Sequence, residues 1–333
     1  MYNIVFRADG SSETGMGHIM RCLATAQMLQ NDFTIAFAIF DVDASVKNII
    51  SSYNYRILEL AGKKDEKFVD RFDAAVIDGY WFDNNYIKEL KKSGTKIIQI
   101  DDLAGSEFFA DIVINHAIGS DYSSSKFFDC KHLLTGSEYA LLRPEFFKAA
   151  ETKRIATQLE SVTISMGGAD PHNFSLSLLQ ALKDILAVVK INVLVGNACS
   201  HKKSLEEFIV KNPEMLIHIQ ESLNAEEMVK LFQTSSLFIC PASTVAYEAL
   251  AVRVPTACFL TAENQQSLYK GLVNTKSVKG LGGLPASSEK ELQVKLSNVF
   301  LEYAELVKIS EQQHVIDGLS GKRIGEAILS LWN

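Results

Sequence analysis

The sequence contains few cysteines, and they are not arranged as disulfide partners or as metal ligands. Its five cysteines are scattered over 333 residues, with no C-x-x-C pair and no histidine partners at metal-ligand spacing. Cysteines of this kind are typical of reduced, mostly buried thiols, which favours a cytoplasmic compartment. No cluster of His, Cys and carboxylate residues indicates a catalytic metal, so we expect neither a metal nor a cofactor. The cysteines are Cys22, Cys130, Cys199, Cys240 and Cys258.

Long apolar runs and an excess of positive charge are also lacking. No apolar run approaches the ~18 residues that cross a bilayer, and the opening MYNIVFRADG lacks the basic and apolar regions of a signal peptide. The formal net charge is -7. This argues against a nucleic-acid partner, because sequence-independent binding needs a basic surface. We expect no membrane insertion, and we expect any anionic ligand to be bound by local groups.

The sequence has what two folded α/β domains need. Of its residues 47% are hydrophobic and 22% are charged, and the length fits two domains. Short apolar runs alternate with amphipathic segments, which predicts parallel strands joined by helical crossovers. In the first half we expect strands at 4–6, 34–40, 74–77, 97–100 and 112–114, and helices at 18–30, 44–52 and 83–92.

A charged, strand-poor stretch at 148–160 separates the two halves. We therefore expect domains at 1–150 and 151–333, each a Rossmann-like doubly wound sheet, facing each other across a cleft. Such sheets bind ligands beyond the carboxyl ends of their strands. In the second half we expect strands at 162–165, 191–195, 216–219, 237–239 and 256–260, and helices at 174–186, 225–232, 244–251 and 265–272.

A polar loop, RADGSSETGMGHIMR, joins the first expected strand to the first helix. In it, Gly15 and Gly17 permit a tight turn or the close approach of a ligand. His18 falls near the first helical turn, where the helix dipole disfavours the imidazolium and leaves a neutral base. The alternative is that His18 only caps the turn. Because the loop, which ends at Arg21, is not the G-x-G-x-x-G fingerprint, it supports dinucleotide binding only weakly.

A second glycine turn, SMGGADPHN, follows a strand of the second half and precedes a helix. Gly167 and Gly168 at a helix start suit a phosphate cradle. In the alternative interpretation the turn is an ordinary Gly-Gly connection in which Asn173 is the N-cap.

A third turn, PASTVAYEAL, places hydroxyl groups at another helix start. Ser243 and Thr244 could bind a diphosphate there, and Glu248, one helical turn further on, could accept hydrogen bonds from ribose hydroxyls. Asn264 and Gln265 supply amides at the next helix start, suited to a sugar. The alternatives are a serine N-cap with a solvated glutamate, and a polar helix cap.

Two acidic pairs resemble metal ligands. The segment 41–43, DVD, matches the pattern by which some glycosyltransferases hold a metal–nucleotide complex, but so short a pattern often arises by chance. Asp101 and Asp102 follow an expected strand, and a polar strand end explains them equally well.

Several segments, in order from about residue 4 to 285, resemble the UDP-sugar hydrolases of the pseudaminic-acid pathway and the related SpsG-like polysaccharide proteins. The segments are RADGSSETGMGHIMRCL, VIDGYWFD, IDDL, LLTGSEYALLRPEF, ISMGGADPHN, STVAYEALA and ENQ. The resemblance implies a glycosyltransferase-B fold like that of MurG, used for hydrolysis. The tail beyond about residue 286 carries no motif, and we expect it to return as a helix to the first domain.

The resemblance also implies the site and the partner, a UDP-linked diacetamido-trideoxy sugar. It gives catalytic roles to His18 and to Tyr80 of the D-G-Y turn, and substrate-binding roles to Gly167, Gly168, Ser243, Thr244, Glu248 and Asn264. Cleavage between the anomeric carbon and the phosphate oxygen, with inversion and without metal, fits the chemistry, because UDP is a good leaving group and His18 can deliver water. The alternatives are a MurG-like glycosyltransferase and a non-catalytic nucleotide-sugar-binding protein. With the residues of the turns, the substrate-binding residues that we expect are Gly15, Gly17, Arg21, Asp78, Gly167, Gly168, Ser243, Thr244, Glu248, Asn264 and Gln265.

Overall fold

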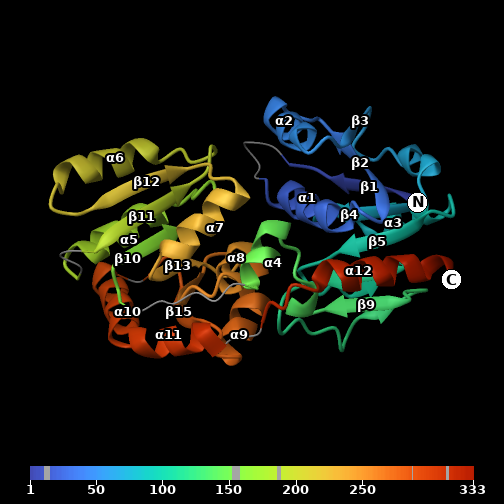
Figure 1. The fold of residues 1–333 in the computed structure, drawn as a ribbon. Helices are drawn as coiled ribbons and strands as arrows, with labels where there is room; N and C mark the ends of the chain where they lie inside the picture. Colours follow the sequence, from blue (N-terminus) through green and yellow to red (C-terminus); the bar gives the residue numbers. More distant parts are fainter. Residues whose placement is uncertain (11–15, 152–157, 186–188, 287, 313–314) are drawn as a thin grey trace. The chain divides into compact units, whose positions relative to one another are not determined.

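The computed structural model describes residues 1–333 except 11–15, 152–157, 186–188, 287 and 313–314 (Figure 1). The chain forms two compact units. The first consists of Met1–Pro144 together with Leu319–Asn333, and the second of Glu145–Gly318. The change of unit thus falls before the expected boundary at 150, and the last fifteen residues, numbered 319–333, belong to the first unit. No helix of the described residues is both long and apolar enough to span a membrane.

The first unit is built on a seven-stranded sheet in the order β3-β2-β1-β4-β5-β7-β9, with every neighbouring pair parallel. The order reverses between β1 and β4, and a doubly wound sheet binds ligands beyond the carboxyl ends of its strands at such a switch point. The strands are β1 (Tyr2–Ala8), β2 (Phe33–Phe40), β3 (Arg56–Leu60), β4 (Ala74–Asp78), β5 (Lys96–Ile100), β7 (Ile112–Asn115) and β9 (His132–Thr135).

Helices cover both faces of this sheet. The helices α1 (Gly17–Leu29), α2 (Ala44–Ser52) and α12 (Ser320–Leu329) contribute to one apolar core, and α3 (Asn84–Lys91) to another. In α1 the buried residues recur at helical spacing, as in Ile19, Leu23 and Ala26, because one stripe of the helix faces the strands. The smaller elements are β6 (Glu107–Phe108), β8 (Lys126–Phe127), η1 (Lys67–Arg71), η2 (Ser137–Tyr139) and η4 (Ser330–Trp332).

The C-terminal helix α12 lies against α1 within the first unit (Figure 1). A Cβ added to Gly321 would lie 3.0 Å from Cβ of Met28, so glycine allows the helices to approach closely. Ile324 and Ile328 of α12 are fully buried in the same core as α1. Helix α1, whose first turn carries His18, is thus packed against α12.

The second unit repeats the same topology in a six-stranded parallel sheet, in the order β12-β11-β10-β13-β14-β15. Its strands are β10 (Ser161–Ser165), β11 (Lys190–Val195), β12 (Ile217–Glu221), β13 (Leu237–Pro241), β14 (Thr256–Leu260) and β15 (Lys279–Gly283). Its helices are α4 (Pro144–Ala150, whose first residue belongs to the first unit), α5 (Phe174–Lys183), α6 (Lys202–Lys211), α7 (Ala225–Thr234), α8 (Thr244–Ala251), η3 (Glu263–Gln265), α9 (Gln266–Asn274), α10 (Glu289–Leu301) and α11 (Tyr303–Gln312).

Both units therefore have the doubly wound, Rossmann-like topology expected from the sequence. Every strand predicted in either half is present, and each predicted helix is present with ends that differ by a few residues. Among the described strands, β3, β9 and β15 of the two large sheets are not predicted, nor are the short strands β6 and β8. β3 is only partly buried along its length and β15 reads KGLGG, so neither shows the continuous apolar run that marks a central parallel strand.

Candidate active site

The β1–α1 turn places His18 at the start of α1, at the switch point of the first sheet. Helix α1 begins at Gly17, and its N-cap residue Met16 makes no side-chain capping hydrogen bond. A Cβ added at Gly17 would meet no described atom within 4 Å, so the space above the helix start is open on that side. The predicted Gly15 lies outside the described residues.

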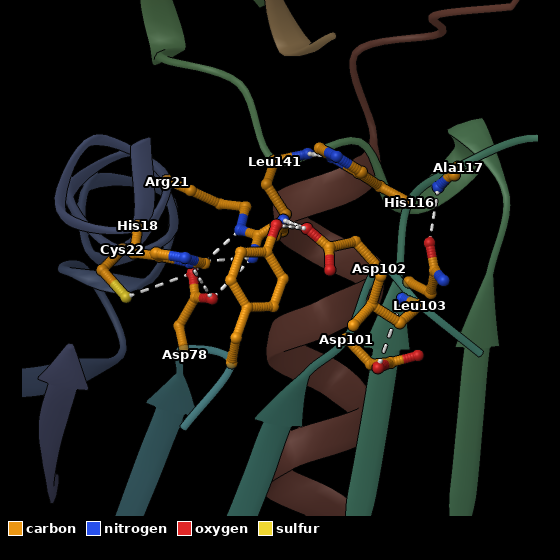
Figure 2. A network of polar contacts seen from close by, with 12 residues as sticks. His18, Arg21, Cys22, Asp78, Asp101, Asp102, Leu103, His116, Ala117 and Leu141 are labelled. Carbon is orange, nitrogen blue, oxygen red and sulfur yellow. Dashed lines mark hydrogen bonds and ion pairs between the residues drawn. The ribbon is translucent and has the colours of Figure 1, made fainter. Parts of the chain in front are cut away.

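His18 is held by a buried carboxylate. Its Nδ1 lies 2.8 Å from Oδ1 of Asp78, the last residue of β4, whose side chain is completely buried. One turn further along α1, Arg21 donates from Nε to Oδ2 of Asp78 at 2.8 Å and from Nη2 to Oδ1 at 2.5 Å. Figure 2 shows these side chains converging from α1 and β4.

The expectation that Asp78 binds substrate directly is not supported by this geometry. Both carboxylate oxygens already accept hydrogen bonds from Arg21, and Oδ1 also contacts His18. The Arg21 side chain is only 10% exposed, and its guanidinium donates to Asp78 and Asp102. Asp78 therefore orients the His18 ring through Nδ1, and Arg21 holds Asp78 in place.

The electrostatics of the pair keep Asp78 charged. Burial by itself would raise the pKa of Asp78, but the Arg21 charge and the hydrogen bonds from Arg21 and His18 outweigh it and lower the pKa to about 2. Burial would lower the pKa of Arg21, yet the Asp78 carboxylate raises it overall. An ionised carboxylate only accepts hydrogen bonds, so in the neutral imidazole of His18 the proton is on Nδ1 and Nε2 keeps its lone pair.

Tyr80 lies beside His18, in the turn that follows β4. The two rings meet edge to face with their centroids 4.8 Å apart. The Tyr80 hydroxyl donates to Oδ2 of Asp102 at 2.9 Å, and Nη1 of Arg21 donates to the same oxygen at 3.3 Å. The structure therefore brings His18, Arg21, Asp78 and Tyr80 together and adds Asp102. Figure 2 shows His18, Arg21, Asp78 and Asp102 close to one another.

A buried cation supports the turn that carries Tyr80. The guanidinium carbon of Arg7, in β1, lies 5.1 Å from the Trp81 ring centroid and 4.8 Å from that of Phe82. The Arg7 side chain is fully buried and paired with Asp9. Stacking of this kind fixes the two aromatic residues directly after Tyr80.

One member of each acidic pair that resembles metal ligands has a structural role. Asp43 caps α2 by accepting from the backbone N–H of Val46. Asp101 accepts from the backbone N–H of Ala104 at 2.8 Å and from the Tyr122 hydroxyl at 2.6 Å. Across the described part of the chain, no group of three or more His, Cys, Asp or Glu side chains is placed to hold a metal ion.

In the second unit the start of α5 does not form the expected phosphate cradle. Asp170, almost completely buried, accepts from the backbone N–H groups of Phe174 and Ser175 at 2.8 and 2.9 Å. A carboxylate therefore already occupies the amides that would face a phosphate. The binding role expected for Gly167 and Gly168, which come before these amides in the turn, stays a prediction.

The turn that contains Gly168 packs closely against the turn that follows β11. A Cβ added at Gly196 would lie 2.7 Å from the carbonyl oxygen of Gly168. The two turns can therefore touch because residue 196 has no side chain. Gly167 has φ of 91°, a backbone conformation that favours glycine.

The start of α8 differs from that of α5. Ser243 is its N-cap residue but makes no side-chain capping hydrogen bond, and no acidic residue occupies the first turn, which begins at Thr244. Glu248, one turn further on, is only 7% exposed. The α8 start thus has neither a side-chain cap from Ser243 nor an acidic residue in its first turn, which suits an anion.

Asn264 and Gln265 lie in η3, directly before α9. The side-chain oxygen of Gln265 accepts from the backbone N–H and the hydroxyl of Thr261, both at 3.0 Å. The Gln265 oxygen thus holds the loop at Thr261. Only the amide nitrogen of Gln265 is left to make the contact with a sugar that the sequence predicts. Asn264 is exposed.

The topology of both units defines the class of protein: it has the glycosyltransferase-B fold. MurG from Acinetobacter baumannii is similar over 99% of this chain and 100% of its own, with a TM-score of 0.69 and 13% identity. Anabaena Alr3699/HepE, solved in complex with UDP and glucose, is similar over 99% of this chain and 100% of its own, with a TM-score of 0.61 and 13% identity.

Sequence relatives narrow the class. The chain is 28% identical over 273 residues to the UDP-2,4-diacetamido-2,4,6-trideoxy-beta-L-altropyranose hydrolase of Campylobacter jejuni, covering 79% of this chain and 93% of that protein. It is 23% identical to the spore coat polysaccharide biosynthesis protein SpsG of Bacillus subtilis, covering 89% and 88%. The resemblance to this hydrolase and SpsG-like family is thereby confirmed.

A further relative is longer than this chain. The uncharacterized protein MJ1062 of Methanocaldococcus jannaschii is 26% identical over 278 residues, which cover 80% of this chain and 57% of that protein. The chain thus spans little more than half of the archaeal relative. No family model matches the chain.

Proposed function

We propose that the protein is a UDP-sugar hydrolase that uses water to cleave the bond between the anomeric carbon and the phosphate oxygen. The observation that carries the proposal is the His18–Asp78 pair, in which a buried carboxylate fixes the imidazole with Nε2 available as a base. The named hydrolase among the relatives and the glycosyltransferase-B fold support it.

In the proposed reaction His18 acts on water from the face of the sugar opposite UDP. The water oxygen forms a bond to the anomeric carbon, its proton goes to Nε2 of His18, and the electron pair of the broken bond leaves with the phosphate oxygen. Configuration is inverted. Asp78 stabilises the imidazolium that forms, as the carboxylate does in other carboxylate–histidine pairs.

The second unit would bind the nucleotide. The first-turn amides of α8, with Ser243 and Thr244, are suited to the diphosphate, and Glu248 to the ribose hydroxyls. Because UDP departs as a stable anion, amides that bind its charge reduce the need for a strong acid. The free sugar that we propose is 2,4-diacetamido-2,4,6-trideoxy-L-altropyranose, after the substrate named for the Campylobacter jejuni relative.

A glycosyltransferase is the second candidate, because the MurG and HepE structures share the fold. The two candidates differ only in what attacks the anomeric carbon. If the protein is a transferase, it releases no UDP until an acceptor hydroxyl is added.

The test is incubation with the UDP-linked sugar in oxygen-18 water with a chelator present. We expect label in the free sugar. Label in UDP would place the attack at phosphorus and refute the mechanism, and release that depends on an acceptor would favour the transferase. A panel of UDP-sugar isomers then identifies the sugar, because stereochemistry at one ring carbon is distinguished by side chains on several loops.

A further inference from the structure

Asp102 is a polar residue of the site. Neither the quoted segment IDDL nor the relatives' names give it a role in the reaction. It follows β5, the strand next to β4, so its side chain reaches the group formed by His18, Arg21 and Tyr80. Its Oδ2 accepts from the Tyr80 hydroxyl at 2.9 Å and from Nη1 of Arg21 at 3.3 Å. The adjacent Asp101 has a different role, because it stabilises the turn after β5 by accepting from the Ala104 N–H and the Tyr122 hydroxyl.

The direction of the Tyr80 hydrogen bond limits what this hydroxyl can do. A phenol has one proton and an ionised carboxylate has none, so the proton of Tyr80 points to Asp102. Toward any other group the phenol oxygen is then an acceptor. A Tyr80 held in this way does not protonate a leaving phosphate, but it can accept a proton of a water molecule.

We infer that Asp102 is a positioning residue that acts through Tyr80. It orients the phenol oxygen as a hydrogen-bond acceptor beside the His18 ring, so that one water molecule is held by two acceptors, Nε2 of His18 and the hydroxyl oxygen of Tyr80. The inference rests on the proposed function and assigns Tyr80 a part in it, that of orienting the water which His18 deprotonates. Misplacing a reactant by about 1 Å can lower the rate by about a hundredfold.

Kinetics of D102A, D102N, Y80F and the double variant D102A/Y80F test the inference. We expect D102A to lower kcat by about 10- to 100-fold with little change in KM. D102N should keep most of the activity, because its carboxamide oxygen still accepts from the phenol. In the Y80F background, D102A should lower kcat almost no further. The matched control D70A removes an exposed aspartate of the same unit and should behave as wild type.

Two kinetic results would overturn the inference. An equal loss from D102A with and without the Tyr80 hydroxyl would mean that Asp102 does not act through it. Equal losses in D102N and D102A would mean that the charge of Asp102 matters rather than its hydrogen bond to Tyr80.

A measurement that does not depend on catalysis separates this inference from the proposed function. Fluorine NMR of protein labelled with 3-fluorotyrosine reports the environment of the Tyr80 phenol, and the Tyr80 resonance is assigned as the one missing in Y80F. We expect the Tyr80 resonance to shift in D102A and to stay near its wild-type position in D102N. If wild-type protein releases no UDP from any UDP-sugar, the proposed function fails, and this resonance alone decides whether Asp102 positions Tyr80. An unchanged resonance in D102A overturns the inference whatever the activity.

Discussion

Nδ1 of His18 lies 2.8 Å from Oδ1 of Asp78, although the two residues are 60 positions apart in the sequence. The strand order explains this proximity. β1 leads toward α1 and pairs in parallel with β4, and in that register Ala8 lies opposite Asp78. The first turn of α1 and the last residue of β4 therefore meet at the same edge of the sheet, which is where the proposed chemistry needs a base and its orienting carboxylate.

His18→Asn should lower turnover much more than nucleotide binding. The variant removes the proposed base, and general base catalysis typically contributes about 10²- to 10⁴-fold. We expect kcat for UDP release to fall within that range and the Kd of UDP, measured by calorimetry, to change less than about twofold, because UDP is proposed to bind to the second unit. His218→Asn, at an exposed position of β12, is the control. Full turnover in His18→Asn would remove the residue from the mechanism.

Asp78→Asn should destabilise the first unit. It leaves the Arg21 charge buried beside a neutral group, and breaking a buried ion pair in this way costs about 3–5 kcal/mol in the free energy of unfolding. Urea unfolding followed by tryptophan emission isolates the effect, because both tryptophans, Trp81 and Trp332, lie in the first unit. The control Glu59→Gln, which breaks the exposed Lys47–Glu59 pair, should cost about 0–1 kcal/mol. Equal losses in the two variants would contradict the prediction.

His116 should make the first unit sensitive to acid. Burial and the nearby Arg21 charge lower the pKa of His116 from 6.5 to about 3. Between these values the unfolded chain binds a proton that the folded chain does not, so the free energy of unfolding falls as the pH falls, by about 1.4 kcal/mol per pH unit. We expect His116→Asn, whose side-chain oxygen can still accept from the Leu141 N–H, to lose this slope between pH 6 and pH 4.5.

The same urea unfolding, repeated at each pH, measures the slope for wild type and for His116→Asn. Comparing the two removes the contribution of the carboxylates that titrate in both. His218→Asn, at its exposed position in the second unit, should keep the wild-type slope in tryptophan emission. If wild type and His116→Asn have the same slope, His116 is not the group that titrates.

Glu248→Gln should weaken UDP binding only through the ribose. We expect about a tenfold rise in Kd for UDP, the scale of one lost charge-assisted hydrogen bond, and no rise for the 2′,3′-dideoxy analogue of UDP, which lacks those hydroxyls. Calorimetry with both nucleotides makes the comparison, and Glu226→Gln, at an exposed position of α7, is the matched control. An equal loss of affinity for both nucleotides would show that Glu248 supports the fold instead of the ribose.

The sequence predicts the sheets well because their central strands are buried on both faces and appear as short apolar runs. It also predicts that His18 lies near the first turn of a helix and that Tyr80 lies in a turn. It does not reveal the ion pair of Arg21 with Asp78, because that pair depends on which strands are neighbours. Nor does it show that Asp170 caps α5, since a polar residue in a glycine turn gives no sign of which amides its carboxylate will reach.

The inclusion of α12 in the first unit has a consequence for folding during synthesis. The chain leaves that unit at Pro144 and re-enters it at Leu319, so the second unit is an insertion within the first. As the protein emerges from the ribosome, every segment of the inserted unit becomes available before the host unit receives Ile324, Ile328 and Leu331, which complete its core. The second unit, which we propose binds the nucleotide, can thus fold first, and the unit that carries His18 can become fully packed only when residues 319–333 have been made.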